Sequence, residues 1–214
     1  MDDATGTHPG TLVNGATQTP QGRFGGGLLL DGSNDYVSVP DSAAWALGSG
    51  DFTLEAFIHL TQIRPGSPGS LPNVLMGHDG GVGNQPKWVW SYAGTTFYLH
   101  INKPGQYSLL LPLGSVALQT GRYYHVALVR DDAQYTMYVD GSVAGTSQST
   151  LALPDAAAPL TLGQAEGLGY LQGRMDEVAV HHQALSAALV RRHAEAGPFG
   201  DGLGDACDAC PTSG

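Results

Sequence analysis

Apolar and polar residues alternate along several short segments of the chain. Residues 52–60, FTLEAFIHL, are apolar at every even-numbered position from Phe52 to Leu60. Residues 97–102, FYLHIN, repeat the pattern with apolar odd-numbered positions. Successive side chains of a β-strand point to opposite faces, so a period of two predicts strands with one face on a core.

Other segments add strands of different kinds and one helix. Residues 123–130, YYHVALVR, are apolar at nearly every position, which is typical of a central strand covered on both sides. Asp140-Gly141 separates two β-rich runs and predicts a tight hairpin. Residues 31–35, DGSND, form a turn between two further apolar stretches. Residues 184–197 favour a helix capped by Ser186 and ended by Gly197-Pro198.

These elements together predict an all-β fold, a two-sheet antiparallel sandwich with one short C-terminal helix that packs on it as a lid. The chain has 214 residues, with 31 glycines and 13 prolines scattered along it, as expected for one domain with many tight turns. Helices are too scarce for a Rossmann fold or an alternating barrel.

Charge and hydropathy exclude several partners. The formal net charge is −10, which repels nucleic-acid phosphates and anionic membrane surfaces. No apolar run approaches the roughly 18 residues of a membrane helix, so we expect no membrane insertion. The acidity has two interpretations, solubility alone or a cation-binding role.

The distribution of acidic residues argues against catalysis. The chain has four glutamates, at positions 55, 166, 177 and 195, and none pairs by spacing with another on one strand. Glycoside hydrolysis needs two facing carboxylates. The sequence holds no G-x-S-x-G motif, and Gly25-Gly26-Gly27 leads into a strand rather than a helix. We therefore predict no catalytic residues. His181-His182 follows the last strand and is interpreted as structural.

Five segments in order resemble one family. They are GRFGGGLLLDGSNDYVSVPDS, GDFTLEAFIHL, GRYYHVALVRDDAQYTMYVDGSVAG, LTLGQ and GRMDEVAVHHQALSAALVRRHAEAG. From about residue 22 to residue 197 the chain resembles the laminin G-like, concanavalin A-like jelly-roll family, and within it the bacterial branch found in large secreted proteins. Phe57 and Tyr123 stand where family members commonly carry Trp, and both keep an aromatic ring.

The resemblance also implies a structural calcium ion. Such jelly rolls often hold calcium between an early turn and an Asp that opens the final long strand. Asp31 and Asp176 match those two positions, and Asp35 is a third candidate ligand in the early turn. Calcium takes six to eight oxygen ligands, which the oxygen-rich turn at 31–35 favours. The alternative is a self-capped hairpin and an exposed aspartate.

The tail DGLGDACDACP resembles the opening of a thrombospondin type 3 repeat, an Asp-rich calcium-binding module. The resemblance makes Asp201, Asp205 and Asp208 calcium ligands and pairs Cys207 and Cys210 with cysteines of neighbouring repeats. It divides the chain into a jelly-roll domain at 1–198 and the truncated start of a repeat at 199–214. A redox or zinc CxxC is the alternative, but neither a βαβ setting nor a second CxxC accompanies it.

Aromatic residues offer a candidate glycan platform. Trp88 and Trp90 share one face of a strand, and Tyr98 and His100 lie on a face of the next strand, opposite its apolar positions. Flat rings with a few polar groups suit sugar recognition. The predicted platform is completed by Asn102, His78 and Asp79. For the two tryptophans, burial in the core is the alternative.

We expect a non-catalytic binding module in a secreted or cell-surface protein, which recognises an extracellular glycan or glycoprotein, carries structural calcium and adjoins other domains of the same chain. The alternative is a purely structural spacer or adhesion module, and a glycan-active enzyme is a distant third. The loops that decide the ligand of a sandwich fold are rich in Gly and Pro here and do not identify it.

Overall fold

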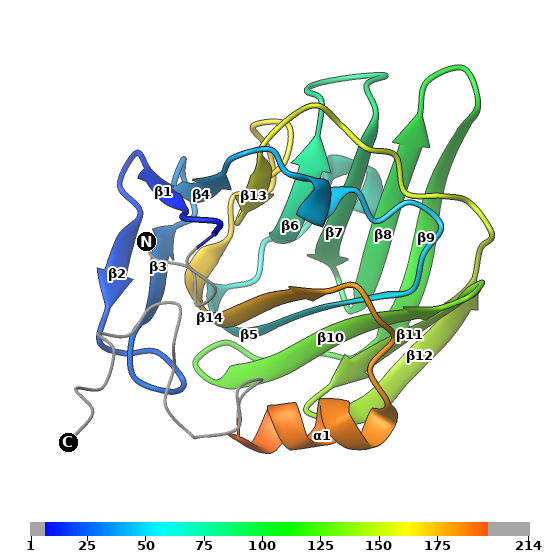
Figure 1. The fold of residues 1–214 in the computed structure, drawn as a ribbon. Coiled ribbons are helices and arrows are strands. Elements are labelled where there is room, and N and C mark those ends of the chain that lie inside the picture. Colours follow the sequence, from blue (N-terminus) through cyan, green and yellow to red (C-terminus); the bar gives the residue numbers. More distant parts are fainter. Residues whose placement is uncertain (1–6, 197–214) are drawn as a thin grey trace.

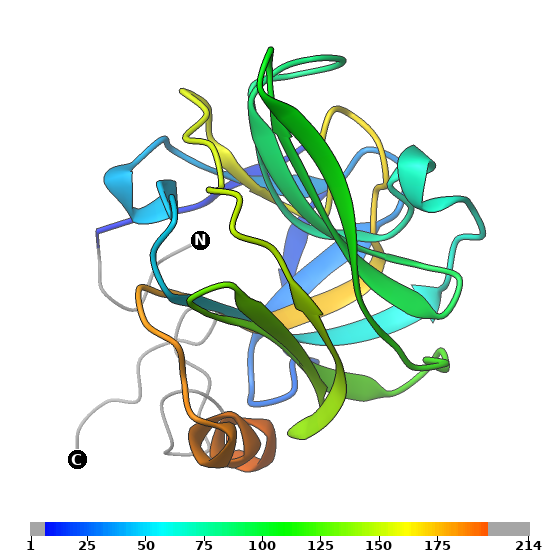
Figure 2. The same ribbon diagram turned by 90° about the vertical axis from the view of Figure 1, so that its right-hand side faces the viewer.

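The computed structural model describes residues 7–196. Within that range the chain folds into two stacked antiparallel sheets of seven strands each, with one α-helix on the outside (Figure 1). Figure 2 shows the layers from a perpendicular direction. The predicted fold class is confirmed.

The first sheet contains, in spatial order, β1 (Thr11–Val13), β4 (Tyr36–Val39), β13 (Leu160–Leu162), β6 (Val74–Asp79), β7 (Lys87–Ala93), β8 (Thr96–Lys103) and β9 (Tyr107–Ser115). The second sheet contains β12 (Ser142–Gln148), β11 (Gln134–Val139), β10 (Tyr123–Asp131), β5 (Phe52–Gln62), β14 (Gln172–His181), β3 (Gly27–Asp31) and β2 (Thr17–Thr19). Two 3₁₀ turns, Ala43–Trp45 and Pro68–Ser70, lie in the connections.

The main core lies between the sheets. Phe52, Leu54 and Ile58 of β5 face it from the second sheet, and Leu99 and Ile101 of β8 face it from the first. All five are fully buried, so the apolar face predicted for each segment is confirmed. The opposite face of β5, predicted to lie off the core, is also buried at Thr53, Glu55 and Phe57. The predicted two-sided burial of residues 123–130 is also confirmed, because β10 lies between β5 and β11 and is covered on its outer face.

Helix α1 (Ala187–Ala196) covers the outer face of the second sheet (Figures 1 and 2). Ser186 caps it, since its side-chain oxygen accepts a hydrogen bond from the Leu189 N–H at 3.3 Å. Val190 of the helix packs with Val129 and Tyr138 of the sheet in a second apolar cluster. The predicted lid is therefore confirmed. No helix in residues 7–196 has the length and apolar character to cross a membrane.

The two predicted turns differ in outcome. Asp140 and Gly141 have φ of 47° and 72° and join β11 to β12 in the predicted hairpin. Residues 31–35 join β3 to β4, which belong to different sheets. The alternative of a self-capped hairpin at 31–35 is wrong in this respect, because the turn carries the chain over the edge of the sandwich.

At the opposite edge the two sheets come into backbone contact. A Cβ atom on Gly145 of β12 would lie 2.6 Å from Cα of Gly114 in β9 and 2.7 Å from the Leu113 carbonyl oxygen. The hydroxyl of Ser147 donates to the Pro112 carbonyl across the same junction. Only residues without a side chain allow the two strands to approach this closely.

We expect Gly145→Ala to destabilise the fold by about 1–3 kcal/mol, because the added methyl group meets backbone atoms that cannot rotate away. Gly50→Ala is the control, since the nearest neighbour of its Cβ would be the Leu47 carbonyl oxygen at the ordinary distance of 3.5 Å. Urea unfolding of both variants measures the difference. Equal free energies of unfolding for the two variants would show that the backbone at the junction accommodates the added methyl group, and would contradict this account.

Candidate functional site

The predicted aromatic platform is divided between the two faces of the first sheet. Trp88 and Trp90 pair with Ile101 and Leu99 across β7 and β8, so their side chains point between the sheets. Both indoles are fully buried in the main core. The prediction that they contact a ligand is wrong, and the alternative of core packing describes them.

Tyr98 and His100 lie on the outer face of the first sheet, as predicted from the alternation of β8. Both are half-buried, and their neighbours in β9 are Pro112 and Leu110. Burial lowers the pKa of His100, and the nearby charge of Lys87 lowers it further. A neutral imidazole and a phenol therefore form what remains of the predicted platform.

The polar residues predicted to complete the platform are used within the protein. His78 is fully buried, and its Nε2 lies 3.0 Å from the Ala158 carbonyl oxygen. Asp79 accepts the Gly81 N–H at 2.9 Å. Asn102 donates to the Gln85 carbonyl at 2.7 Å, which fixes the loop between β6 and β7. None of these bonds reaches outward, so the three residues support loops rather than the predicted ligand contact.

A buried ion pair fastens the same loop. The Lys87 ammonium group contacts Glu166 and also donates to the carbonyl oxygens of Gly81 and Gly83, at 3.0 and 2.7 Å. Lys87 is 1% exposed. The pair joins the loop between β6 and β7 to the loop between β13 and β14.

The predicted calcium ligands of the jelly roll make hydrogen bonds to the backbone. Asp35 is buried and accepts the N–H of Gly15 at 2.7 Å and that of Asp31 at 3.0 Å. Asp31 accepts the Ser33 N–H at 2.7 Å, and this bond holds the pKa of Asp31 below its usual value. Asp176 is buried and accepts the Arg23 N–H at 2.6 Å.

Asp31 and Asp176 do not share a site. Asp31 pairs with Gln172 and Leu28 pairs with Met175, so Asp176 falls beside Gly27, four residues along β3 from Asp31. Four residues of a strand span roughly 13 Å, whereas calcium holds its ligand oxygens within about 2.6 Å. The prediction that one ion joins them is wrong, because β14 runs antiparallel to β3 and carries Asp176 to its other end.

The remaining predicted metal ligands, Asp201, Asp205 and Asp208, lie outside the described residues, as do Cys207 and Cys210. Within residues 7–196, two groups of side chains have the spacing to hold a metal ion: Glu55 with His181 and His193, and Asp41 with His78 and Asp155. Neither group includes the predicted Asp31, Asp35 or Asp176.

A hollow of about 550 Å³ opens at the edge of the sandwich. We call it the loop-edge hollow. Its walls are the β3–β4 turn at Gly32 and Ser33, the segment from Gln62 to Pro72, and the loop at residues 167–170. Tyr170 is half-buried there and Leu168 is 46% exposed.

Arg64 organises the loop-edge hollow. Its guanidinium donates to the Gly32 carbonyl, and its backbone N–H donates to the Asn73 side chain at 2.8 Å. Its Nε is buried and has no hydrogen-bond partner among the described residues. Opposite it, Gly169 has φ of 64°, and a Cβ there would lie 1.9 Å from the Leu71 carbonyl oxygen. The walls therefore combine a donor, a ring and hydroxyl groups on a tightly folded backbone.

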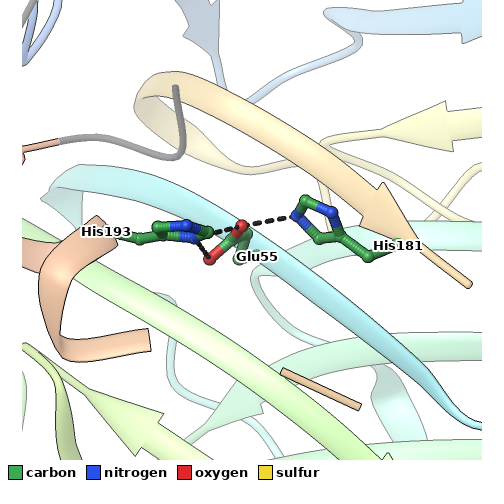
Figure 3. A group of neighbouring side chains, drawn as sticks. All are labelled: Glu55, His181 and His193. Carbon is green, nitrogen blue, oxygen red and sulfur yellow. Dashed lines mark hydrogen bonds and ion pairs between the residues drawn. The ribbon is translucent and has the colours of Figure 1, made fainter. Parts of the chain in front are cut away.

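A second polar centre lies on the outer face of the second sheet. Glu55 of β5 is fully buried and meets three imidazoles: Nε2 of His125 at 3.2 Å, Nε2 of His181 at 2.6 Å and Nδ1 of His193 at 3.0 Å. Figure 3 shows His181 and His193 approaching the carboxylate from opposite sides. Burial raises the pKa of Glu55, but the three hydrogen bonds outweigh burial and hold that pKa below its usual value.

Neither centre was found from the sequence. Arg64 and Tyr170 stand 106 positions apart, and the segment that begins at Arg64 is interpreted from the sequence only as a loop. Glu55 was considered only as an unpaired catalytic acid. The sequence held one indication of the second centre. Glu55 is a charged residue on a strand in a chain rich in other apolar strand segments, and a charge that such segments bury needs partners.

Residues 31–191 match the family model described as the concanavalin A-like lectin/glucanases superfamily, Laminin_G_3. A comparison with curated protein sequences finds no match. Among solved structures, the fold is similar to domain 4 of AbnA, an extracellular GH43 arabinanase from Geobacillus stearothermophilus, in complex with arabinotriose. Identity is 17% and the TM-score is 0.70, over 90% of this chain and 92% of that one.

Two further structures share the fold. The binding domain of Paraclostridial Mosquitocidal Protein 1 is 13% identical, with a TM-score of 0.65, over 88% of this chain. This chain spans only 47% of that domain's length. A putative carbohydrate binding protein from Bacteroides ovatus is 20% identical, with a TM-score of 0.54, over 73% of this chain and 43% of that one.

We expect Lys87→Met to destabilise the protein by about 3 kcal/mol, because it leaves the Glu166 carboxylate without its cation in a site that is 10% exposed. The double variant Lys87→Met/Glu166→Gln removes that charge and recovers part of the loss. Urea unfolding of the single and double variants measures both. A loss below about 1 kcal/mol in the single variant would contradict this account of the pair.

Proposed function

The chain belongs to the concanavalin A-like lectin/glucanases superfamily, and we propose that it is a non-catalytic module that binds an extracellular glycan or glycoprotein. The observation that carries this proposal is the loop-edge hollow of about 550 Å³, whose walls bring the polar side chains of Arg64, Gln62 and Ser33 beside the ring of Tyr170. A concave site that combines a ring with a few polar groups is typical of ligand binding.

The chemistry of the loop-edge hollow suits a sugar. Sugar rings present hydroxyl groups at their rims and C–H groups on their faces. Arg64, Gln62 and Ser33 supply donors and acceptors for the hydroxyl groups, and the half-buried ring of Tyr170 supplies a surface for the C–H face. Domain 4 of AbnA, which shares the fold, was solved with arabinotriose, and this supports a saccharide as the ligand class.

The absence of acids from the lining supports a binding role over hydrolysis. None of the residues that line the loop-edge hollow is Asp, Glu, His or Cys. Glycoside hydrolysis needs a pair of carboxylates at the scissile bond. Glu55 is buried among histidines on the outer face of the second sheet, and Glu166 is paired with Lys87. Neither glutamate lines the hollow.

We place this module in a secreted or surface-attached protein of the bacterial branch, next to other domains of the same chain. Its resemblance to secreted modules supports this, as does the extracellular arabinanase among the proteins that share its fold. The tail at 199–214, which lies outside the described residues, is proposed as the start of a thrombospondin type 3 repeat.

We expect Arg64→Ala and Tyr170→Ala each to weaken saccharide binding about tenfold, the loss of one charge-assisted hydrogen bond or one stacked ring. A glycan array that includes arabinan, laminarin and alginate fragments identifies the ligand, and calorimetry with that ligand gives the affinities. Circular dichroism checks that both variants fold.

Tyr98→Ala is the matched control, because Tyr98 is an equally half-buried tyrosine on the outer face of the first sheet. If Tyr98→Ala abolishes binding while Tyr170→Ala does not, the ligand binds β8 and the loop-edge hollow is excluded. If the intact chain retains no glycan or glycoprotein at all, the module is a spacer and the proposed function is wrong.

We further propose that calcium binds the aspartates of the tail, Asp201, Asp205 and Asp208, with a dissociation constant of about 10⁻⁴–10⁻³ M, the range of extracellular modules. After treatment with a chelator, calorimetric titration of the full chain should show binding that replacement of all three by Asn removes. Asp31→Asn and Asp176→Asn should leave it unchanged. Loss of binding in either of these two variants would place calcium on the jelly roll instead.

A further inference from the structure

The Glu55 carboxylate poses a problem of charge. It is 0% exposed, and the groups that face it come from three elements: His125 from β10, His181 from β14 and His193 from α1. Within residues 7–196, no lysine or arginine forms an ion pair with it. A buried carboxylate needs hydrogen-bond donors or a cation to offset its burial, and a metal ion is one such cation.

His125 contacts the carboxylate differently from the other two histidines. Its Nε2 faces Oε2 of Glu55 at 3.2 Å, and its Nδ1 is buried without a partner among the described residues. His125 therefore contacts the carboxylate at Oε2, whereas His181 and His193 both meet Oε1.

His181 and His193 present ring nitrogens to the same carboxylate oxygen, Oε1, at 2.6 and 3.0 Å. All three prospective ligand atoms lie within 4.8 Å of one another. Two imidazoles and one carboxylate form a donor set typical of zinc, which binds them at about 2.0–2.2 Å in a tetrahedron. Small outward shifts of these side chains would convert the hydrogen-bond spacing into a coordination site (Figure 3).

We propose that Glu55, His181 and His193 bind one divalent transition-metal ion, and that zinc is the preferred ion. His125 serves as a positioning residue, because its hydrogen bond to Oε2 orients the carboxylate. His181 is 23% exposed, which gives the ion a path of entry and leaves the fourth position to water. The ion joins β5, β14 and α1 and so fastens the helix to the sheet.

This centre is independent of saccharide binding. Glu55 and Gln62, a wall residue of the loop-edge hollow, are seven residues apart on β5, roughly 23 Å along the strand. Glu55 also points to the outer face of the second sheet, beneath α1. The two proposals can therefore succeed or fail separately.

Cobalt(II) is the probe, because it replaces zinc and gives a visible absorption band whose intensity reports four-coordinate geometry. The full chain is stripped with a chelator and titrated with cobalt(II) and, separately, with zinc. The variant Cys207→Ser/Cys210→Ser serves as the background, so that tail thiols contribute no metal site. We expect the band to saturate at one ion per chain, and zinc to displace it and raise the unfolding midpoint.

His181→Ala should weaken metal binding at least tenfold and remove the band, and we expect the fold to tolerate it because His181 is the last residue of β14 and only half-buried. His182→Ala is the matched control, an adjacent exposed histidine whose Nε2 lies 3.0 Å from the Ala44 carbonyl oxygen. Glu55→Gln keeps the shape of the side chain, removes its charge, and should also lose the band.

Two results would overturn the proposal. If neither metal changes the absorption or the unfolding midpoint of the background protein, the centre is a proton-linked cluster of hydrogen bonds. If the response survives both His181→Ala and Glu55→Gln while circular dichroism shows intact folding, the ion binds elsewhere, for example at Asp41, His78 and Asp155.

Discussion

From Phe52 to Ile58, strand β5 is buried on both sides, and much of the structure follows from that constraint. In this stretch the even-numbered side chains fill the space between the sheets, and Thr53, Glu55 and Phe57 are covered on the outer face. An apolar strand would meet this constraint with packing alone. This strand carries Glu55 in the middle of the covered outer face, beside the small residues Ala127 and Ala179 of the neighbouring strands. The space that these alanines leave is what admits the imidazoles.

The two candidate centres use the fold in different ways. The loop-edge hollow is made by connections, which in sandwich folds vary freely and determine what is bound. The Glu55 centre is made by strands and a helix, which hold side chains more precisely than loops do. The first therefore suits recognition of an external molecule, and the second suits an internal fastening of the helix to the sheet.

The sequence predicted those features that depend on neighbours along the chain. The alternation of β5 and β8, the hairpin at Asp140-Gly141 and the cap at Ser186 each needed only a few adjacent residues. Features that depend on pairing between distant segments were missed or wrong. Residues 31–35 look like a hairpin turn locally, and only the sheet order shows that they cross between layers. The distance from Asp31 to Asp176 depends on the register of β14 against β3, which no local pattern encodes.

The glycine junction between β9 and β12 also affects how such modules behave in a series. Edge strands present unpaired backbone groups, which invite pairing with a second chain, and this leads to domain swapping or aggregation. Here two sheet edges press against each other at Gly114 and Gly145, and Ser147 donates across the gap. Each edge thus shields part of the other from incoming strands. Pro112 adds to this protection, because it lies in the edge strand β9 and has no N–H to offer an incoming strand. A chain that strings several such sandwiches together gains protection from misassembly between identical neighbours.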